Sequence, residues 1–558
     1  LRKIHVIVLN AGRKKWQDLL DFGDGKKIKK MKNRIQNFIQ QAIAIIFSIL
    51  FAVALINAIF FNKTVGINYN VIFMLVGTII IYIIMFVFYY LCKKNNKSFL
   101  ERKPKKTDYF LVVTIIFFIQ FILAKFTYTR YGWDCGKVIS DVYGLINSGK
   151  FEFLYYAQYP NNIGIFIIIK NVIEIAKYFV DVQIIYNCFL SAMIFNIIMV
   201  DIASIFTFLT IKKVIGNKSA YLSLIFIFPL MLFSPYINIP YTDTISMVFP
   251  IIILYLYICI KELPKERIKK YILSFLLGML MLIGVFIKPT VIIMPIAIII
   301  IEILNLNKEK LKNIVYSIIV MIFFIMGCGI SYLGYNIQKN QIFGELISKQ
   351  AQEDFKRSYT HFLMMGMQER QNDVIGDGKN QTLYGTYNVQ DDLNTYSIKG
   401  YKEKQEYNLK IIKERLKNFG IIGYIKFLYN KANWILSDGT FYYGYEGTWI
   451  VDGYQNQNKV AKIVQKFITV DSKTYKYITA NIMQISWLII LLGLMLSYSK
   501  EKNEYLDIGK LAIIGIILFI LIFEGRARYL VNYIPIFIFI GVDGLKISLN
   551  KILTMKDK

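Results

Sequence analysis

Long apolar runs recur along almost the whole chain and are separated by short polar stretches. A helix needs about 20 mostly apolar residues to cross the hydrocarbon core of a membrane, and the chain has about twelve such runs. The pattern therefore predicts an all-α polytopic membrane protein. The predicted crossings lie near residues 38–61, 69–91, 108–126, 183–210, 219–235, 244–261, 271–288, 290–305, 313–336, 477–498, 509–524 and 529–547.

The charged residues indicate the orientation of these crossings. The net charge is +29, and Lys and Arg concentrate between the apolar runs, as they do in cytoplasmic loops. We therefore expect anionic membrane lipids, and no nucleic acid, as partners of this charge. Alternation from a cytoplasmic N-terminus places every strongly basic loop inside, namely 93–106, 212–218, 261–270, 308–312 and 500–502.

The apolar segment 161–180 cannot be a further crossing, because one more span would invert every loop after it. Lys170, Glu174 and Lys177 interrupt it at intervals. This spacing predicts a helix that lies in the outer membrane interface.

The same alternation predicts the organisation of the chain. Residues 1–30 are polar and a basic start at Met31 leads into the first apolar run, so we expect translation to begin at Met31. The large outer segment, residues 337–476, is rich in Tyr, Asn, Gln and Gly, and we expect it to pack onto the membrane region. The predicted parts are a cytoplasmic segment 1–36, a transmembrane region 37–336 with an outer loop 127–182, an extracytoplasmic segment 337–476, helices 477–547 and a cytoplasmic tail 548–558.

The sequence excludes several kinds of cofactor chemistry. His5 and His361 are the only histidines, and no CxxC pair suggests a zinc site. The chain also contains no P-loop and no dinucleotide-binding fingerprint. No cofactor is therefore predicted, and a divalent metal next to Asp134 is left open without a dedicated set of ligands.

Asp134 is the leading candidate for a catalytic residue. It lies in Gly132-Trp133-Asp134-Cys135-Gly136, just beyond an apolar run. Placing a carboxylate at a membrane boundary costs free energy, so its presence there indicates a functional role. As a general base, a carboxylate can accept a proton from an attacking hydroxyl group. The alternative is that Asp134 caps a helix or pairs with Arg130 or Lys137.

Three cations are predicted on the outer side, where positive charge is uncommon. Lys288 precedes the helix-breaking Pro289, and Arg526 and Arg528 stand between the last two crossings. Arginine side chains match phosphate oxygens well, so we interpret the three cations as a phosphate site. The alternative is an ion pair with Glu524, which could satisfy only one arginine.

Other polar residues on the outer side are candidates for binding a sugar or an acceptor. Asparagine amides at the start of the interfacial helix can bind sugar oxygens, although the same segment also suits an ordinary helix entry. Asp243 could instead be a helix cap, and a lone histidine is more often structural. The candidates are Tyr159, Asn161, Asn162, Asp243, His361, Glu524 and Tyr529.

Taken in order, these elements resemble the GT-C superfamily of integral membrane glycosyltransferases, over roughly Tyr109 to Val542. The nearest group is the family 39 type, which includes protein O-mannosyltransferases and aminoarabinose transferases, in a bacterial version. The resemblance rests on Asp134, the interfacial helix, Lys288 with its proline, H-F-L-M-M-G-M from His361, G-T-Y-N from Gly385, and E-x-R-x-R-Y-L from Glu524. The chain departs from the mannosylating members in having Cys135 where they have Glu after the Asp, and it lacks their additional outer domain.

The resemblance implies inverting transfer of a sugar from a polyprenyl-phosphate donor to a cell-envelope acceptor, which could be a glycan, a teichoic polymer, a lipid or a protein. Asp134 would be the base, and Lys288, Arg526 and Arg528 would hold the lipid phosphate. The site would lie on the extracytoplasmic face of the bacterial cell membrane. Two alternatives stay open: a flippase of lipid-linked sugars, favoured by Asp201 within a predicted crossing, and a polymerase or ligase of polyprenyl-linked glycans.

Overall fold

The computed structural model describes residues 41–94, 106–264, 268–305, 314–344, 346, 353–372, 381–498 and 502–556. The predicted translation start at Met31 lies outside these residues. Within them, eleven helical segments are long and apolar enough to cross a membrane, and a twelfth predicted crossing forms the shorter helix Pro289–Leu304. The eleven are Gln41–Phe60, Val71–Leu91, Phe110–Thr127, Ile185–Val214, Asn217–Asn238, Thr242–Glu262, Ile268–Ile287, Ser317–Phe343, Tyr475–Met495, Glu504–Ile522 and Ala527–Met555. The predicted all-α polytopic fold is therefore confirmed.

Most crossings consist of one regular α-helix. These helices are α2 (Val71–Lys94), α3 (Lys106–Thr127), α7 (Ile185–Val214), α8 (Asn217–Ile227), α10 (Val248–Glu262), α11 (Ile268–Ile287), α12 (Ile293–Leu304), α14 (Ile314–Phe343), α21 (Ala480–Met495), α22 (Glu504–Ile522) and α23 (Ile534–Lys556). Several are extended at the predicted outer end by short irregular turns, in three of which proline occupies the first turn. The turns are η2 (Phe228–Leu232), η3 (Pro235–Asn238), α9 (Thr242–Ile245), η4 (Pro289–Ile292), η5 (Tyr475–Thr479) and η6 (Ala527–Tyr533).

Glycines allow the central helices to approach closely. A Cβ atom added at Gly544 on α23 would lie 1.8 Å from the carbonyl oxygen of Gly493 on α21. Small residues at such contacts are typical of membrane helix packing, because lipid supplies no hydrophobic force between helices. A larger side chain at Gly544 would push α21 and α23 apart.

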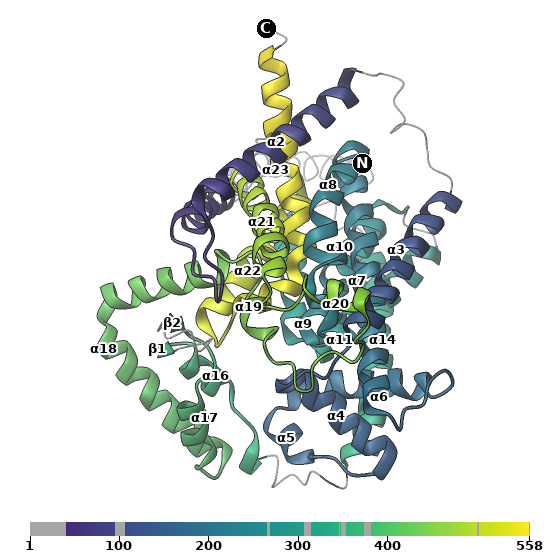
Figure 1. Cartoon of the computed structure of the whole chain (residues 1–558), viewed down its shortest axis with the longest axis vertical. Helices are drawn as coiled ribbons and strands as arrows, with labels where there is room; N and C mark the ends of the chain where they lie inside the picture. Colours follow the sequence, from purple (N-terminus) through teal and green to yellow (C-terminus); the bar gives the residue numbers. More distant parts are fainter. Residues whose placement is uncertain are drawn as a thin grey trace, which may run out of the picture.

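Ion pairs group the helix ends as the predicted alternation requires. Lys213 pairs with Glu262, and Lys261 lies 3.3 Å from Glu504, which brings together three predicted inner ends. The C-terminus lies at the same end of the molecule (Figure 1). The predicted outer loops gather at the opposite end, where α4, α5, α6 and α17 are drawn.

The loop 127–182 folds into short helices that cover the outer end. They are α4 (Trp133–Ser148), α5 (Phe153–Gln158), η1 (Pro160–Asn162) and α6 (Ile163–Ala176). With 14 residues, α6 is too short to cross a membrane of about 30 Å. It corresponds to the predicted interfacial helix.

The segment 337–476 packs onto the membrane helices, as expected. It contains a small separate apolar cluster around Met364, Met367 and Ile412, whereas Phe427 and Trp434 belong to the main core. Its antiparallel strands pair with Glu369 opposite Tyr384. Its elements are α16 (Tyr359–Met365), β1 (Glu369–Asn372), β2 (Gln381–Tyr384), α17 (Val389–Tyr396), α18 (Tyr401–Leu436), α19 (Tyr443–Glu446) and α20 (Lys459–Gln465).

Candidate active site

Asp134 lies half-buried in the first turn of α4, at the outer end of the helix bundle. Gly132 is the N-cap residue, so Asp134 does not cap the helix itself. Gly136 makes this turn possible, because a Cβ atom there would lie 1.6 Å from the carbonyl oxygen of Tyr131. Of the two flanking glycines, Gly136 therefore serves close backbone packing next to the acid.

Neither cation near Asp134 in the sequence is its partner. Arg130 lies 3.0 Å from Asp452, and Lys137 pairs with Asp141 at 2.6 Å and with Glu152 at 2.9 Å. Within the part of the chain that the structure describes, Asp134 forms no ion pair. Its carboxylate is thus left without a direct counter-ion.

A chain of hydrogen bonds ends on the Asp134 carboxylate. Tyr241 donates to the Oδ1 atom of Asn162 at 3.1 Å, and Asn162 donates to the hydroxyl of Tyr155 at 2.6 Å. Tyr155 in turn donates to Oδ1 of Asp134 at 2.7 Å. Burial and the Asp134 carboxylate both raise the pKa of Tyr155, so its hydroxyl stays a donor. The network orients one carboxylate oxygen and leaves the other available.

For the sugar transfer that the resemblance implies, we expect Tyr155→Phe to lower the turnover roughly tenfold, because a hydrogen bond to a charged group contributes about 1.5 kcal/mol. Donor KM should stay constant, since Tyr155 contacts the acid and not the cations. Steady-state kinetics in lipid nanodiscs measure both. Tyr143→Phe removes a hydroxyl of the same helical loop whose partner among the described residues is the Gln183 carbonyl, and it serves as the matched control.

The three predicted outer cations meet two buried carboxylates. Asp243, at the start of α9, pairs with Lys288 and lies 3.2 Å from Nε of Arg528. The Oε1 atom of Glu446 lies 3.1 Å from Arg528 and 2.9 Å from Arg526. We call these five residues the cation cluster. Within these five residues, three positive charges face two negative ones. The Glu524 carboxyl lies outside this set but interacts electrostatically with all three cations.

Glu446 is the partner that sequence reasoning missed. The anticipated alternative paired one arginine with Glu524, but both arginines contact Glu446, which comes from a different part of the chain. The only signal in the sequence was a single acid directly after the aromatic run Phe441 to Tyr445. An acid within an aromatic segment indicates a buried carboxylate with a cationic partner, because burying a carboxylate without a cation costs free energy.

Trp133 links the acid to the cation cluster. Its ring lies 4.4 Å from the guanidinium carbon of Arg528, within the range of a cation–π contact, and packs edge-on against Tyr241 at 5.0 Å. Because Trp133 directly precedes Asp134, the catalytic candidate and the cluster belong to one site. Lys288 is covered in a similar way by the ring of Tyr529 at 4.5 Å.

Backbone strain occurs on both sides of this site. Trp133, Phe441 and Tyr442 have positive φ angles of 44°, 53° and 70°, a region that residues with a side chain seldom adopt. The Asp438 carboxylate holds the second turn by accepting the backbone N–H of Tyr442 at 2.8 Å. Strain of this kind persists where the surroundings enforce it, and here it places Trp133 over Arg528 and α19 beside both arginines.

The segment that carries the arginines is hydrogen-bonded to two motifs of the outer segment, H-F-L-M-M-G-M from His361 and G-T-Y-N from Gly385. The backbone N–H of Glu524 donates to the carbonyl of Phe362 at 2.7 Å, and that of Gly525 donates to Gly385 at 2.9 Å. Burial raises the pKa of Glu524, while Arg526 and Arg528 oppose the rise. Both motifs thus position the arginines through backbone contacts.

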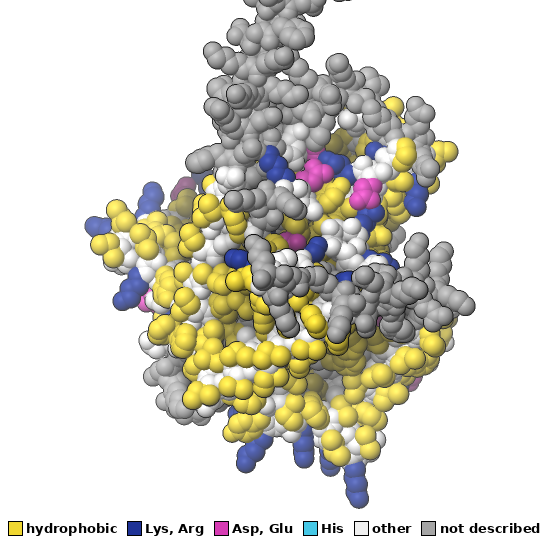
Figure 2. Space-filling model, turned by 90° about the horizontal axis from the view of Figure 1, so that it is seen from above, with side chains coloured by type: hydrophobic (Ala, Val, Ile, Leu, Met, Phe, Trp, Pro, Cys, Tyr) yellow, Lys and Arg dark blue, Asp and Glu magenta, His cyan; other side chains and the backbone are white. Residues whose placement is uncertain are grey.

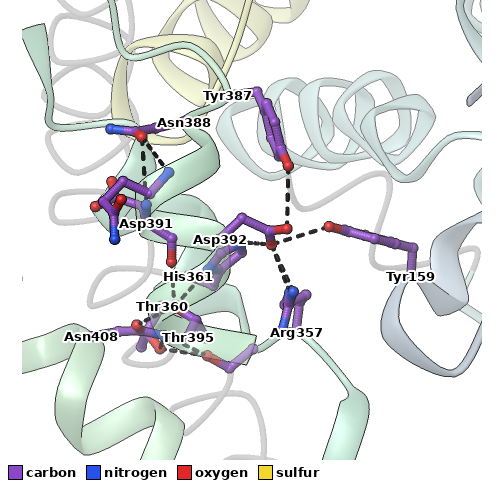
Figure 3. A network of polar contacts seen from close by, with 12 residues as sticks. Tyr159, Arg357, Thr360, His361, Tyr387, Asn388, Asp391, Asp392, Thr395 and Asn408 are labelled. Atoms are coloured by element: carbon purple, nitrogen blue, oxygen red, sulfur yellow. Dashed lines mark hydrogen bonds and ion pairs between the residues drawn. The ribbon is translucent and has the colours of Figure 1, made fainter. Parts of the chain in front are cut away.

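A second polar network surrounds Asp392, and it contains two of the predicted binding residues (Figure 3). Tyr159 donates to Asp392 at 3.2 Å, and the buried His361 lies 3.4 Å from the same carboxylate. Arg357 completes the network with two contacts, at 2.9 Å and 2.8 Å. Tyr159 therefore connects the loop 127–182 to the outer segment, and His361 has structural partners.

We expect Asp392→Asn to destabilise the outer segment by about 3 kcal/mol, because it leaves the buried Arg357 unpaired. Burial alone would raise the pKa of Asp392, but His361 and Arg357 outweigh this effect and lower it. The stabilisation is thus present above the unfolded pKa of about 3.9 and is lost as the pH falls through the folded value. The apparent Tm of the two proteins should differ at pH 7 and converge in acid. Asp471→Asn, at an exposed position, is the control.

The described residues contain no group of three or more His, Cys, Asp and Glu side chains that could hold a metal ion. Asp243 and Glu446 are paired with Lys288 and with the two arginines. No catalytic step is assigned to a metal, and a divalent ion next to Asp134 stays a prediction.

Comparisons with known proteins give two matches. No curated protein matches the chain. Among solved structures, the chain is similar to "Crystal Structure of ArnT from Cupriavidus metallidurans bound to Undecaprenyl phosphate", with 11% sequence identity, a TM-score of 0.30, and coverage of 80% of this chain and 78% of that chain. A family model described as "Conserved hypothetical integral membrane protein" matches residues 35–547. The chain therefore belongs to this family of integral membrane proteins.

Proposed function

We propose that the chain is an inverting glycosyltransferase that moves a sugar from a polyprenyl-phosphate donor to an acceptor on the extracytoplasmic face of the bacterial cell membrane. One observation carries the proposal. Asp134, a carboxylate without a counter-ion among the described residues, directly follows Trp133, whose ring covers Arg528 of the cation cluster. A general base and an anion site are thus held together by one helix start.

The cation cluster has the properties that a phosphate site requires. Its five residues carry one positive charge in excess, which matches one negative charge of a phosphodiester. Burial raises the pKa of the neighbouring Glu524 carboxyl, which favours the neutral form of that group. The Nε atom of Arg526 is buried, and no described residue accepts a hydrogen bond from it. The Nε atom of Arg528 faces Asp243 at 3.2 Å as an ion pair, without the alignment of a hydrogen bond. Buried donors without an acceptor cost free energy, and phosphate oxygens would satisfy them.

The reaction then follows from the two halves of the site. Asp134 accepts the proton of the acceptor hydroxyl as its oxygen attacks the anomeric carbon, and a glycosidic bond forms on the face opposite the phosphate. The bond between that carbon and the phosphate oxygen breaks, and the electron pair leaves with the polyprenyl phosphate. Arg526, Arg528 and Lys288 stabilise the growing negative charge, and such stabilisation is often the largest single catalytic contribution.

The predicted binding residues divide into two groups. Asn162 is committed to the hydrogen-bond chain of Asp134, and Asp243 neutralises Lys288 and Arg528. Asn161 is exposed beside Asn162, so it remains a candidate for contacting a sugar, as does the Glu524 carboxyl.

The decisive experiment incubates the purified protein with polyprenyl-phosphate hexoses and envelope fractions in nanodiscs. Mass spectrometry should detect release of polyprenyl phosphate together with a glycosylated product. Transport of the intact lipid-linked sugar across vesicles without cleavage would instead establish a flippase. Products that carry whole oligosaccharides would establish a polymerase or ligase.

A further inference from the structure

The long helix α18 is bent, and the bend separates two arms. Gly420 has a φ of 58° and a ψ of −178°, which lies outside the helical region and interrupts the helix. A Cβ atom at Gly420 would meet nothing within 4 Å, so the glycine serves the backbone conformation and not close packing. The second arm, residues 421–436, runs from the bend back to the helix bundle (Figure 1).

The second arm exposes large apolar side chains along one face. Ile421 is 83% exposed, Ile422 84% and Ile425 62%, and Tyr429 continues the row at 47%. Their spacing of one, four and eight residues places them on one side of a helix. On the other side, Phe427 is buried in the core. Leaving an isoleucine side chain in water costs about 2 kcal/mol relative to burial, so this face calls for an apolar environment.

The exposed face is continuous with the surface that the membrane covers. The Tyr429 hydroxyl donates to Asn57 at 2.8 Å, near the outer end of the crossing Gln41–Phe60, and Asn433 donates to the carbonyl of Phe61 at 2.9 Å. A groove of about 350 Å³ lies where α18 meets this crossing and α22. Its lining is apolar and includes Ile49, Val53, Tyr429, Leu436, Ile517 and Leu521.

Basic side chains accompany the apolar face. Lys413 and Lys417 precede the bend, Lys426 follows it, and all three are exposed. Figure 2 views the molecule from the C-terminal end, and there the projection on the left, where α18 lies in Figure 1, shows hydrophobic side chains bordered by Lys and Arg. This combination suits the boundary between acyl chains and anionic headgroups.

We propose that the second arm of α18 docks into the outer leaflet of the lipid bilayer, with Ile421, Ile422 and Ile425 among the acyl chains and Lys426 at the headgroups. The inference is independent of the proposed enzymatic function. It connects the membrane surface to the site mechanically, because Lys431 on this arm donates to the carbonyl oxygens of Leu521 and Phe523 at 3.1 Å and 2.7 Å. The arginine-bearing segment begins at the next residue.

Fluorescence tests the docking with the full chain in nanodiscs of phosphatidylcholine and phosphatidylglycerol. An environment-sensitive NBD label is attached to Ile422→Cys in a cysteine-free background. We expect blue-shifted emission, strong quenching by lipids brominated along the acyl chain, and several-fold weaker quenching by aqueous iodide than at Lys413→Cys. The latter is an exposed position on the first arm of the same helix.

Equal iodide quenching at the two positions would overturn the proposal, and so would the absence of quenching by brominated lipid. If Ile422→Cys does not fold, Ile425→Cys on the same face gives the same measurement. A label that is shielded only after another protein is added would identify the face as a protein-docking surface and count against lipid docking.

Discussion

Asp134→Asn is expected to abolish sugar transfer while the protein still folds and binds the donor. The substitution keeps the shape of the side chain and its hydrogen bond from Tyr155, but it removes the carboxylate that we propose as the base for the acceptor proton. General-base assistance contributes a factor on the order of 10² to 10⁴ in rate, so kcat should fall by at least that lower bound. Donor affinity should change little, because Asp134 forms no ion pair with the described cations.

Steady-state transfer and donor binding, measured on the same nanodisc preparation, separate the two effects. Asp452→Asn is the matched control, because it removes a carboxylate from the same outer region that pairs only with the peripheral Arg130 among the described cations. It should retain full turnover. Unimpaired transfer by Asp134→Asn would refute the role of Asp134 as the base.

Arg528→Ala should raise the donor KM by roughly 30-fold to 100-fold, since a charged hydrogen bond contributes about 2 to 3 kcal/mol. The guanidinium group is the centre of the cation cluster, where it contacts Asp243, Glu446 and the ring of Trp133. Arg528→Lys keeps the charge but loses the planar fork, so it should lie between the wild type and the alanine variant.

Removing Arg528 leaves Asp243 with Lys288 and Glu446 with Arg526 as their single cationic partners among the described residues, which should lower the yield of folded protein. The double variant Arg528→Ala with Glu446→Gln restores the one positive charge in excess within the cation cluster. We expect it to recover thermal stability without recovering donor affinity. If the double variant recovers donor affinity as well, Arg528 has a structural role and the phosphate contact is made elsewhere. Arg130→Ala controls for loss of an arginine outside the site.

The pattern of apolar runs was sufficient to predict the membrane-spanning helices, because the lipid bilayer sets two simple requirements for a span. A span must be apolar over about 20 residues and must satisfy its own backbone, and both requirements are visible in the chain. The alternation of loops predicted that the segment containing α6 is not a further crossing, and the lack of a strong hydrophobic core predicted that the outer segment packs onto the membrane region.

The partners of the charged residues were not predictable, because ion pairs join positions that are far apart in the chain. Glu446 meets Arg526 and Arg528 across about eighty residues, and Asp243 meets Lys288 across 45. Tyr159 and His361, singled out as candidates for substrate binding, meet instead at Asp392. No spacing rule relates such positions, since only the helix packing brings them together.

The sequence by itself determined that the chain crosses the membrane repeatedly, which end faces the basic loops, and that Asp134, Lys288, Arg526 and Arg528 lie on the same side. Hydrophobic length and charge distribution are local properties, so they can be read directly. Only the tertiary structure decided that Trp133 bridges the acid to the cations, that Glu446 and Asp243 neutralise two of three positive charges, and that α18 bends at Gly420. These features depend on contacts between side chains that are distant in the sequence. In a buried site, a charge without a partner costs free energy, so the packing brings opposite charges together.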